Sequence, residues 1–271
     1  MKSPKRRYVL KPTKPTFLDI LRRLKKEPIE FNEFLKLLEE ISDKFYENSE
    51  LEFELLLING LPIDIKNNFV YLKTTQTSLD EQSFCFVDIE TNGGSPKQGY
   101  QIIELGAVKY KNGKIIDKFE SLVYAKDVAP YIQEVTNITL DMLQNAPRLE
   151  KVLKEFKTFL GDDVFVAHDI KFDYNFISDS FEKYSLGTLL NRKICTIDLS
   201  KRTILSPKYG LSTLKELLNI DVENHHRAYY DALTTKIIFE NCLRNIDREK
   251  VKTTEDLIAF SKSNNIIKSN I

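Results

Sequence analysis

Apolar positions along residues 84–245 follow two different periods, one typical of strands and one of helices. Strand-like runs predict strands at 84–89, 102–110, 115–124, 164–167 and near 194–197. Apolar residues that return every three or four positions predict helices at 149–160, 173–184 and 228–242. The dipeptide Asn112-Gly113, between the second and third strands, is a strong signal for a tight hairpin. This order predicts an α/β domain with a mixed sheet and helices on both faces.

Residues 17–75 have another pattern and are predicted to form a small separate domain. Helical spacing at 17–24, 34–41 and 51–58 precedes two short strands around Asn67-Asn68. Three helices and a hairpin suggest a winged-helix-like fold. Acidic residues dominate the last two of these helices, so DNA phosphates would be repelled. We therefore favour protein docking over DNA reading for this domain.

Three remaining segments are mostly polar. Residues 1–16 carry six basic residues, three prolines and no acid, which predicts a flexible basic arm. Residues 76–83 are predicted to be a linker, in which Gln76-Thr77-Ser78-Leu79 faintly resembles a sliding-clamp peptide without its terminal aromatic residue. Residues 246–271 are expected to form a C-terminal helix, capped near Thr253, and a tail.

Composition narrows the functional classes. The 271 residues carry 40 basic and 40 acidic side chains, so net charge indicates neither a nucleic acid nor a membrane. Three cysteines without paired spacing argue against a disulfide framework or a zinc site and fit a reducing compartment. No apolar run approaches the roughly 20 residues that cross a bilayer, and no signal peptide is evident. We expect a soluble, cytoplasmic protein with no membrane partner.

Four carboxylates in three short segments predict a metal site. Asp88 and Glu90 lie two residues apart on one strand, so both project from the same face. The strand is apolar, and unpaired charge is expensive in such a place, which favours a metal site over solvated acids. Asp173 begins a predicted helix, where negative charge is favoured, and Asp231 lies one turn inside the last long predicted helix. Four acids balance two Mg²⁺ or Mn²⁺ ions, a pair suited to phosphodiester cleavage.

His226 lies five residues before Asp231, at the entrance of the last long predicted helix. An imidazole at this position could accept the proton of an attacking water molecule. The small Ala228 and Ala232 share the side of the helix that carries Asp231, which would let the helix approach the sheet closely. The neighbouring His225 is expected to have no role in the site.

The three segments are similar to the motifs of the DEDDh 3′–5′ exonucleases, the DnaQ-like family. Residues 88–91 match its DxET motif, residues 168–173 its HNxxFD motif, and residues 226–231 its HxAxxD motif. The family includes the proofreading epsilon subunit of bacterial DNA polymerase III and the exonuclease domain of PolC-type polymerases. The resemblance covers about residues 84–245 and implies a DEDDh 3′–5′ exonuclease domain there, with the ribonuclease H-like architecture.

The resemblance also implies roles for eight residues. Asp88 would bridge two metal ions, with Glu90 and Asp231 completing the first site and Asp173 contributing to the second. His226 would be the catalytic base. The implied substrate-binding residues are Thr91, His168 and Phe172; for the phenylalanine, packing behind the site is the alternative to stacking on a base.

Three residues depart from the family pattern, and one of them is Asn92, which replaces the second threonine of an ETTG sequence. Asp169 replaces an asparagine and is expected to accept backbone hydrogen bonds at a helix entrance. Asn137 replaces a glycine in a turn, and asparagine tolerates left-handed backbone geometry. None of the three departures removes a predicted metal ligand.

The leading hypothesis is a metal-dependent 3′–5′ exonuclease that acts on single-stranded DNA 3′ ends and releases nucleoside 5′-monophosphates. Its expected partner is the replicative DNA polymerase, for which it would proofread. One alternative is an RNA-trimming enzyme of the ribonuclease T kind, which would differ in how its pocket treats the 2′-hydroxyl. Another is a non-catalytic polymerase-docking protein, although such proteins generally lose metal ligands.

Overall fold

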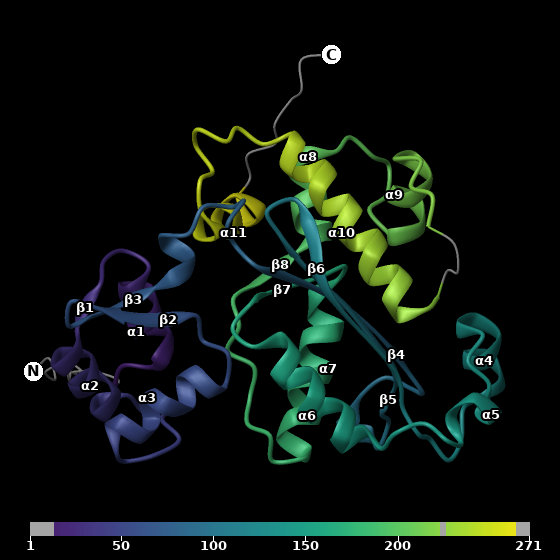
Figure 1. Cartoon of the computed structure of the whole chain (residues 1–271), viewed down its shortest axis with the longest axis horizontal. Coiled ribbons are helices and arrows are strands. Elements are labelled where there is room, and N and C mark those ends of the chain that lie inside the picture. The colour runs from purple at the N-terminus through teal and green to yellow at the C-terminus, as the bar shows by residue number, and fades with distance from the viewer. Residues whose placement is uncertain (1–13, 223–225, 264–271) are drawn as a thin grey trace, which may run out of the picture. The chain divides into compact units, whose positions relative to one another are not determined.

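The computed structural model describes residues 14–222 and 226–263, which form two compact units (Figure 1). The first unit holds the described chain up to Leu55 together with Ile63–Leu72, and the second holds Leu56–Pro62 and the chain from Lys73. Most of the predicted basic arm, His225 and the end of the predicted tail lie outside the described residues. In the described part of the chain, no helix has both the length and the apolar character that membrane crossing requires.

The first unit contains a three-stranded antiparallel sheet with helices around it. Its helices are α1 (Phe17–Leu24), α2 (Phe31–Glu40) and the start of α3 (Ser49–Ile58). Its strands are β1 (Ile29–Glu30), β2 (Ile63–Lys66) and β3 (Phe69–Leu72), and they are ordered β1-β3-β2 in the sheet. Asn67 and Asn68 take φ values of 50° and 66°, as a two-residue hairpin turn requires, so the predicted hairpin is confirmed. The sequence pattern missed β1 because two residues carry no periodic signal.

A five-stranded mixed sheet forms the centre of the second unit. Its strands are β4 (Phe84–Thr91), β5 (Ile102–Lys111), β6 (Lys114–Leu122), β7 (Val164–Ala167) and β8 (Lys193–Cys195), in the order β6-β5-β4-β7-β8. The central β4 is antiparallel to β5 and parallel to β7. All five strands lie where the alternation of apolar residues predicted them, so the mixed α/β class is confirmed.

Helices cover both faces of this sheet (Figure 1). One face packs against α6 (Leu149–Leu160) and α7 (Ile170–Lys183). The other packs against α8 (Thr196–Thr203), α9 (Leu211–Leu217), α10 (Ala228–Arg244) and α11 (Thr254–Lys262).

The predicted capping box is confirmed at the start of α11, where the side chains of Thr253 and Asp256 each accept the backbone N–H of the other residue. Two short helices, α4 (Pro130–Thr136) and α5 (Leu140–Leu143), follow β6. Like α8 and α9, these two helices were not predicted from the sequence.

The alternation of β4 decides which face receives the acids. Cys85, Val87 and Ile89 belong to the core beneath α6 and α7, whereas Phe84 and Phe86 belong to the core beneath α10. Because side chains alternate along a strand, Asp88 and Glu90 continue the phenylalanine series and lie on the α10 face.

Helix α10 runs antiparallel to β4 along this face. Phe239 packs against Phe84 and Phe86, with ring centroids 5.0 and 5.2 Å apart. Asp231 precedes Phe239 by eight residues, about 12 Å along a helix. Asp88 follows Phe84 by four residues, about 13 Å along a strand. The two lengths match, so packing of the aromatic residues brings Asp231 over Asp88.

Gly106 of β5 lets α10 approach the sheet. It is the register partner of Asp88, and a Cβ atom added there would lie 2.1 Å from the backbone nitrogen of Tyr229 and 2.3 Å from the carbonyl carbon of Ala228. Ala228 and Ala232 are fully buried. The predicted close approach is therefore confirmed, and Gly106, to which the sequence assigned no role, is part of it.

The segment 76–83 is packed into the second unit. The backbone N–H of Leu79 donates to the carbonyl of Lys252 at 3.1 Å, and Ser78 forms an antiparallel bridge with Thr253. The side chain of Leu79 is buried in the core beneath α10. The leucine of the clamp-like peptide is therefore not presented at the surface.

Candidate active site

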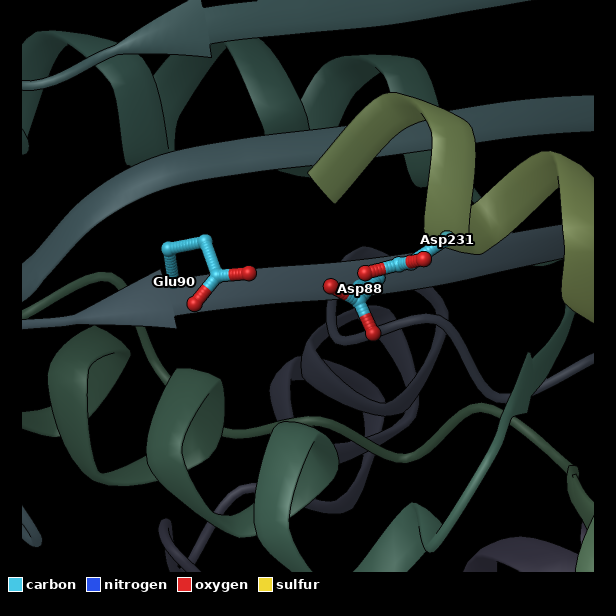
Figure 2. Close-up of side chains that lie close together, drawn as sticks. All are labelled: Asp88, Glu90 and Asp231. Atoms are coloured by element: carbon cyan, nitrogen blue, oxygen red, sulfur yellow. The ribbon is translucent and has the colours of Figure 1, made fainter. Parts of the chain in front are cut away.

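Asp88, Glu90 and Asp231 form an acidic cluster on the α10 face of the sheet. Each contributes a carboxylate oxygen, and the three oxygens lie within 4.8 Å of one another. Figure 2 shows Asp88 and Glu90 projecting from one strand while Asp231 comes from the overlying helix. The structure thus brings together three of the four predicted metal ligands from two segments far apart in the sequence.

Asp173 approaches the acidic cluster from the other layer of helices. Strand β7 pairs with β4 only as far as Phe86, so the β4 backbone beyond that point is open on this side. The N–H of Ile89 uses this opening to donate to Asp173 Oδ1 at 3.2 Å. Asp173 is buried, and its charge acts on Asp88. It therefore lies beside the cluster, at the carboxyl ends of two parallel strands, where ligand sites of α/β sheets occur.

The carboxylates repel one another in a buried place. Burial, reinforced by the charges of Asp231 and Glu104, raises the pKa of Glu90 to about 8. Burial is also the main reason that the pKa of Asp173 rises to about 8. Burial and then the charge of Asp173 raise the pKa of Asp88 well above its usual range. Oxygen ligands with such an excess of negative charge suit a hard divalent cation, so the donor set fits Mg²⁺ or Mn²⁺.

An ion pair with a buried carboxylate lies beside the acidic cluster and was not predicted from the sequence. Glu104 of β5 is 0% exposed and is the register partner of Glu90. Arg227 Nε and Nη2 donate to Glu104 Oε1 at 2.9 and 2.6 Å, and the N–H of Ala228 donates to Oε2 at 2.9 Å. The sequence hinted at this pair only through Glu104, a single acidic residue within the apolar run at 102–108. Nothing in the sequence around Arg227 indicated that it pairs with a residue 123 positions away.

His226 precedes the first residue of α10 by two positions, and its side chain is exposed. Its φ of 59° lies in the left-handed region, which is uncommon for residues other than glycine. Among the described residues, the group of close ligand atoms comprises the three acids of the cluster and does not include His226. Its role as catalytic base stays a prediction.

The three predicted substrate-binding residues differ in their surroundings. Both ring nitrogens of His168 have protein partners, Thr196 Oγ1 at 2.8 Å and the carbonyl of Tyr209 at 2.9 Å. Burial lowers the pKa of His168 to about 4, so the ring is neutral and donates from Nε2, because a carbonyl only accepts. Thr91 Oγ1 donates to the carbonyl of Gly93 at 2.8 Å, whereas the ring of Phe172 is 41% exposed. Their contacts with substrate stay predictions.

Two of the three departures from the family pattern, Asn137 and Asp169, adopt left-handed backbone geometry. Asn137 has a φ of 57°, as expected for an asparagine that replaces glycine. Asp169 has a φ of 62° at the N-cap of α7, but its side chain makes no capping bond there within the described structure. The expectation that its side chain accepts backbone bonds is therefore wrong. Its carbonyl accepts the N–H of Phe172 instead, at 3.0 Å.

A hollow of about 270 Å³ opens beside the acidic cluster. Its lining residues come from the end of β4, the following glycine turn and α4: Glu90, Thr91, Gly93, Gly94, Tyr131, Ile132, Val135 and Thr136. Tyr131 is 65% exposed and gives the hollow an aromatic side chain. Because α4 was not predicted from the sequence, Tyr131 was not among the predicted site residues.

These features define a class of protein, an α/β protein that gathers acidic residues into a candidate metal site at the carboxyl edge of a ribonuclease H-like sheet. The family profile described as Exonuclease (RNase_T) matches residues 85–239, more than half of the chain. The chain therefore belongs to the RNase T-type, DnaQ-like exonuclease family, and the resemblance seen in its motifs is confirmed.

PolC-type DNA polymerases III are relatives of the chain. The protein of Staphylococcus haemolyticus (strain JCSC1435) is 39% identical over 206 residues, which cover 75% of this chain and 14% of that protein. The Staphylococcus aureus protein is 41% identical over 188 residues, which cover 68% of this chain and 12% of that protein. The chain thus spans about a seventh of the length of these curated relatives.

Solved exonucleases share the fold at low sequence identity. Exonuclease X in complex with 5′ overhanging duplex DNA has a TM-score of 0.51 and 23% identity, covering 66% of this chain and 99% of that one. Escherichia coli exonuclease I in complex with a dA16 oligonucleotide has a TM-score of 0.54 and 15% identity, covering 66% of this chain and 43% of that one. At these identities the similarity establishes the architecture alone.

Proposed function

We propose that the protein is a metal-dependent 3′–5′ exonuclease that shortens single-stranded DNA from the 3′ end and releases nucleoside 5′-monophosphates. The observation that carries this proposal is the acidic cluster, with three carboxylate oxygens within 4.8 Å of one another. The adjoining hollow supports it, because about 270 Å³ lies just below the usual range of small-ligand pockets and suits a single nucleotide. Residues 84–245 are the proposed exonuclease domain.

In this proposal, Asp88, Glu90, Asp173 and Asp231 hold two Mg²⁺ or Mn²⁺ ions. When bound, such ions supply positive charge to the attacking and leaving oxygens of phosphodiester hydrolysis. The rigid β4 holds two of the four acids, which keeps the ligands in place. His226, exposed at the start of α10, takes the proton of the attacking water.

The terminal nucleotide is proposed to occupy the hollow beside Glu90. There Tyr131 offers its exposed ring to the base or sugar, and Thr91 lines the hollow next to Glu90. Phe172 offers a second exposed ring, and stacking on aromatic rings is a sequence-tolerant way to hold single strands. His168, whose two nitrogens are bonded within the protein, would act by holding the turn before α7.

The test is digestion of a 5′-labelled single-stranded DNA oligonucleotide by the full chain. We expect a ladder of products shortened from the 3′ end in Mg²⁺ or Mn²⁺, and none after chelation. An Asp88→Asn variant purified identically controls for contaminating nucleases. Faster trimming of the matched RNA would favour an enzyme of the ribonuclease T kind, and an intact 3′ end under all conditions would favour a non-catalytic docking protein.

We further propose that this exonuclease proofreads for the replicative DNA polymerase. Identity of about 40% to part of PolC-type DNA polymerases III supports this role. The expected results are co-purification with the replicative polymerase and faster removal of mispaired than of paired 3′ termini. Equal rates on both termini, without co-purification, would contradict a proofreading role.

Residues 17–75 are proposed to be a winged-helix-like module that docks on a protein. The order of helices and strands in the first unit supports this, and α3 has three acidic residues and no basic one, so it would repel phosphates. The side chains of Phe45 and Tyr46 lie on a loop and are 56% and 52% exposed. The backbone N–H groups of these two residues donate to the carboxylate of the buried Glu52 at 3.0 and 2.9 Å, which holds the loop in place. Replacing both aromatic residues by alanine should abolish co-purification with the polymerase and leave oligonucleotide digestion unchanged.

A further inference from the structure

We propose that Glu104 and Arg227 are positioning residues that act as one unit. Their ion pair holds the start of α10 in place, and the charge of Arg227 prevents Glu104 from competing as an additional metal-binding acid. The kinetic consequences rest on the proposed function, whereas the consequences for metal binding can be measured without it.

The position of Glu104 makes a counter-charge necessary. Glu104 and Glu90 are register partners on neighbouring antiparallel strands, so their side chains project from the same face. Directly opposed residues of such strands have Cβ atoms about 4.5–5.5 Å apart, and like charges there are destabilising. Glu104 is fully buried, so water cannot screen it. An unpaired carboxylate at this position would extend the acidic cluster.

Arg227 supplies that counter-charge with tight geometry. Its guanidinium donates to Glu104 through Nε at 2.9 Å and through Nη2 at 2.6 Å. Arginine suits this task because its planar donor fork matches a carboxylate.

The same carboxylate anchors the helix that carries Asp231. Glu104 Oε2 accepts the N–H of Ala228, the first residue of α10, at 2.9 Å. The first N–H groups of a helix have no partner within the helix, so Glu104 satisfies one that would be buried and unpaired. Asp231 lies three residues further along the helix, and His226 lies next to Arg227. One buried side chain thus orients the backbone on which a metal ligand and the proposed base stand.

The decisive measurement is Mn²⁺ binding to the metal-free protein and to the variants Glu104→Gln, Arg227→Gln and the double variant. Arg227→Gln leaves an uncompensated acid and should tighten Mn²⁺ binding, whereas Glu104→Gln leaves an uncompensated cation and should weaken it. Each shift should be about five- to tenfold, as for one unit charge acting on a divalent ion within a Debye length. In the double variant the shifts should cancel. Charge compensation predicts these opposite signs, and a purely structural role does not.

The kinetic measurement tests positioning. Each single variant should lower kcat by about 10- to 100-fold, the usual cost of removing a residue that orients metal ligands, while KM for the oligonucleotide stays unchanged. The double variant should be no slower than the slower single variant. Glutamine at 104 still accepts the Ala228 N–H, so folding should persist. Arg248→Gln is the matched control, because it breaks an exposed 2.8 Å pair with Asp80; it should change neither affinity nor kcat.

Shifts in Mn²⁺ affinity of the same sign, or no shifts, would overturn the proposal. A rise in KM confined to Arg227→Gln would also overturn it, since Arg227 would then be a contact for substrate phosphates. If the unaltered protein leaves oligonucleotides intact, the proposed function fails, but the Mn²⁺ measurement still decides whether the pair balances the charge of the site.

Discussion

Replacing Gly106 by alanine tests whether the close approach of α10 to the sheet sets the geometry of the acidic cluster. The added Cβ would lie 2.1 Å from the Tyr229 nitrogen, whereas ordinary contacts begin at 3.4 Å. The difference, 3.4 − 2.1 = 1.3 Å, must come from displacement of backbone, because the nearest atoms belong to Ala228 and Tyr229 rather than to a flexible side-chain end. Asp231 is two residues beyond Tyr229 and would move with it.

The displacement gives the expected magnitudes. Misplacing a reacting group by about 1 Å can cost about 10²-fold in rate, so kcat for 3′-end digestion should fall by about that factor. Overpacking a well-packed core typically costs about 1–3 kcal/mol, so the free energy of unfolding should fall by that amount. The chain should nevertheless stay folded at low temperature, where the rate is to be measured.

The assay compares kcat and thermal unfolding of Gly106→Ala with those of Gly210→Ala. A Cβ at Gly210 meets no described atom within 4 Å, and the backbone there needs no positive φ. This control should keep the rate of the unaltered protein. If Gly106→Ala is stable and also keeps that rate, the packing of α10 on β5 does not determine the geometry of the site.

Three further predictions concern the acids and the histidine. His226→Ala should lower kcat by about 10²–10⁴-fold with little change in unfolding temperature, and an undiminished rate would exclude it as the base. Without metal, the protein should lose stability as pH rises from about 5 through about 8, because Glu90 and Asp173, with pKa values raised to about 8, stabilise the fold when protonated. Thermal unfolding in a chelator checks this, and increasing stability over that range would contradict it. Asp88→Asn should abolish cleavage and raise the unfolding temperature of the metal-free protein at pH 8, since one of several crowded charges is gone; a largely unfolded variant would argue against a metal site.

Local patterns in the chain were enough to predict much of the second unit. The alternation along β4 placed Asp88 and Glu90 on one face, because a strand has a period of two whatever surrounds it. The Asn112-Gly113 hairpin and the Thr253 capping box were likewise predictable, since turns and caps depend on a few adjacent residues. The same holds for Asp173 and Asp231, each in the first turn of a helix.

By itself, therefore, the sequence determined the strands, the long helices and, through three short motifs, the identity of the acids, because each is written in residues close together in the chain. Only the tertiary structure decided how α10 lies on β5 at Gly106, how Tyr131 comes to line a hollow beside Glu90, and how Glu104 meets Arg227 across 123 positions. These contacts depend on packing between segments distant in the chain. Periodicity carries no information about which distant residues pair, so neither residue of such a pair can be inferred from the sequence around the other.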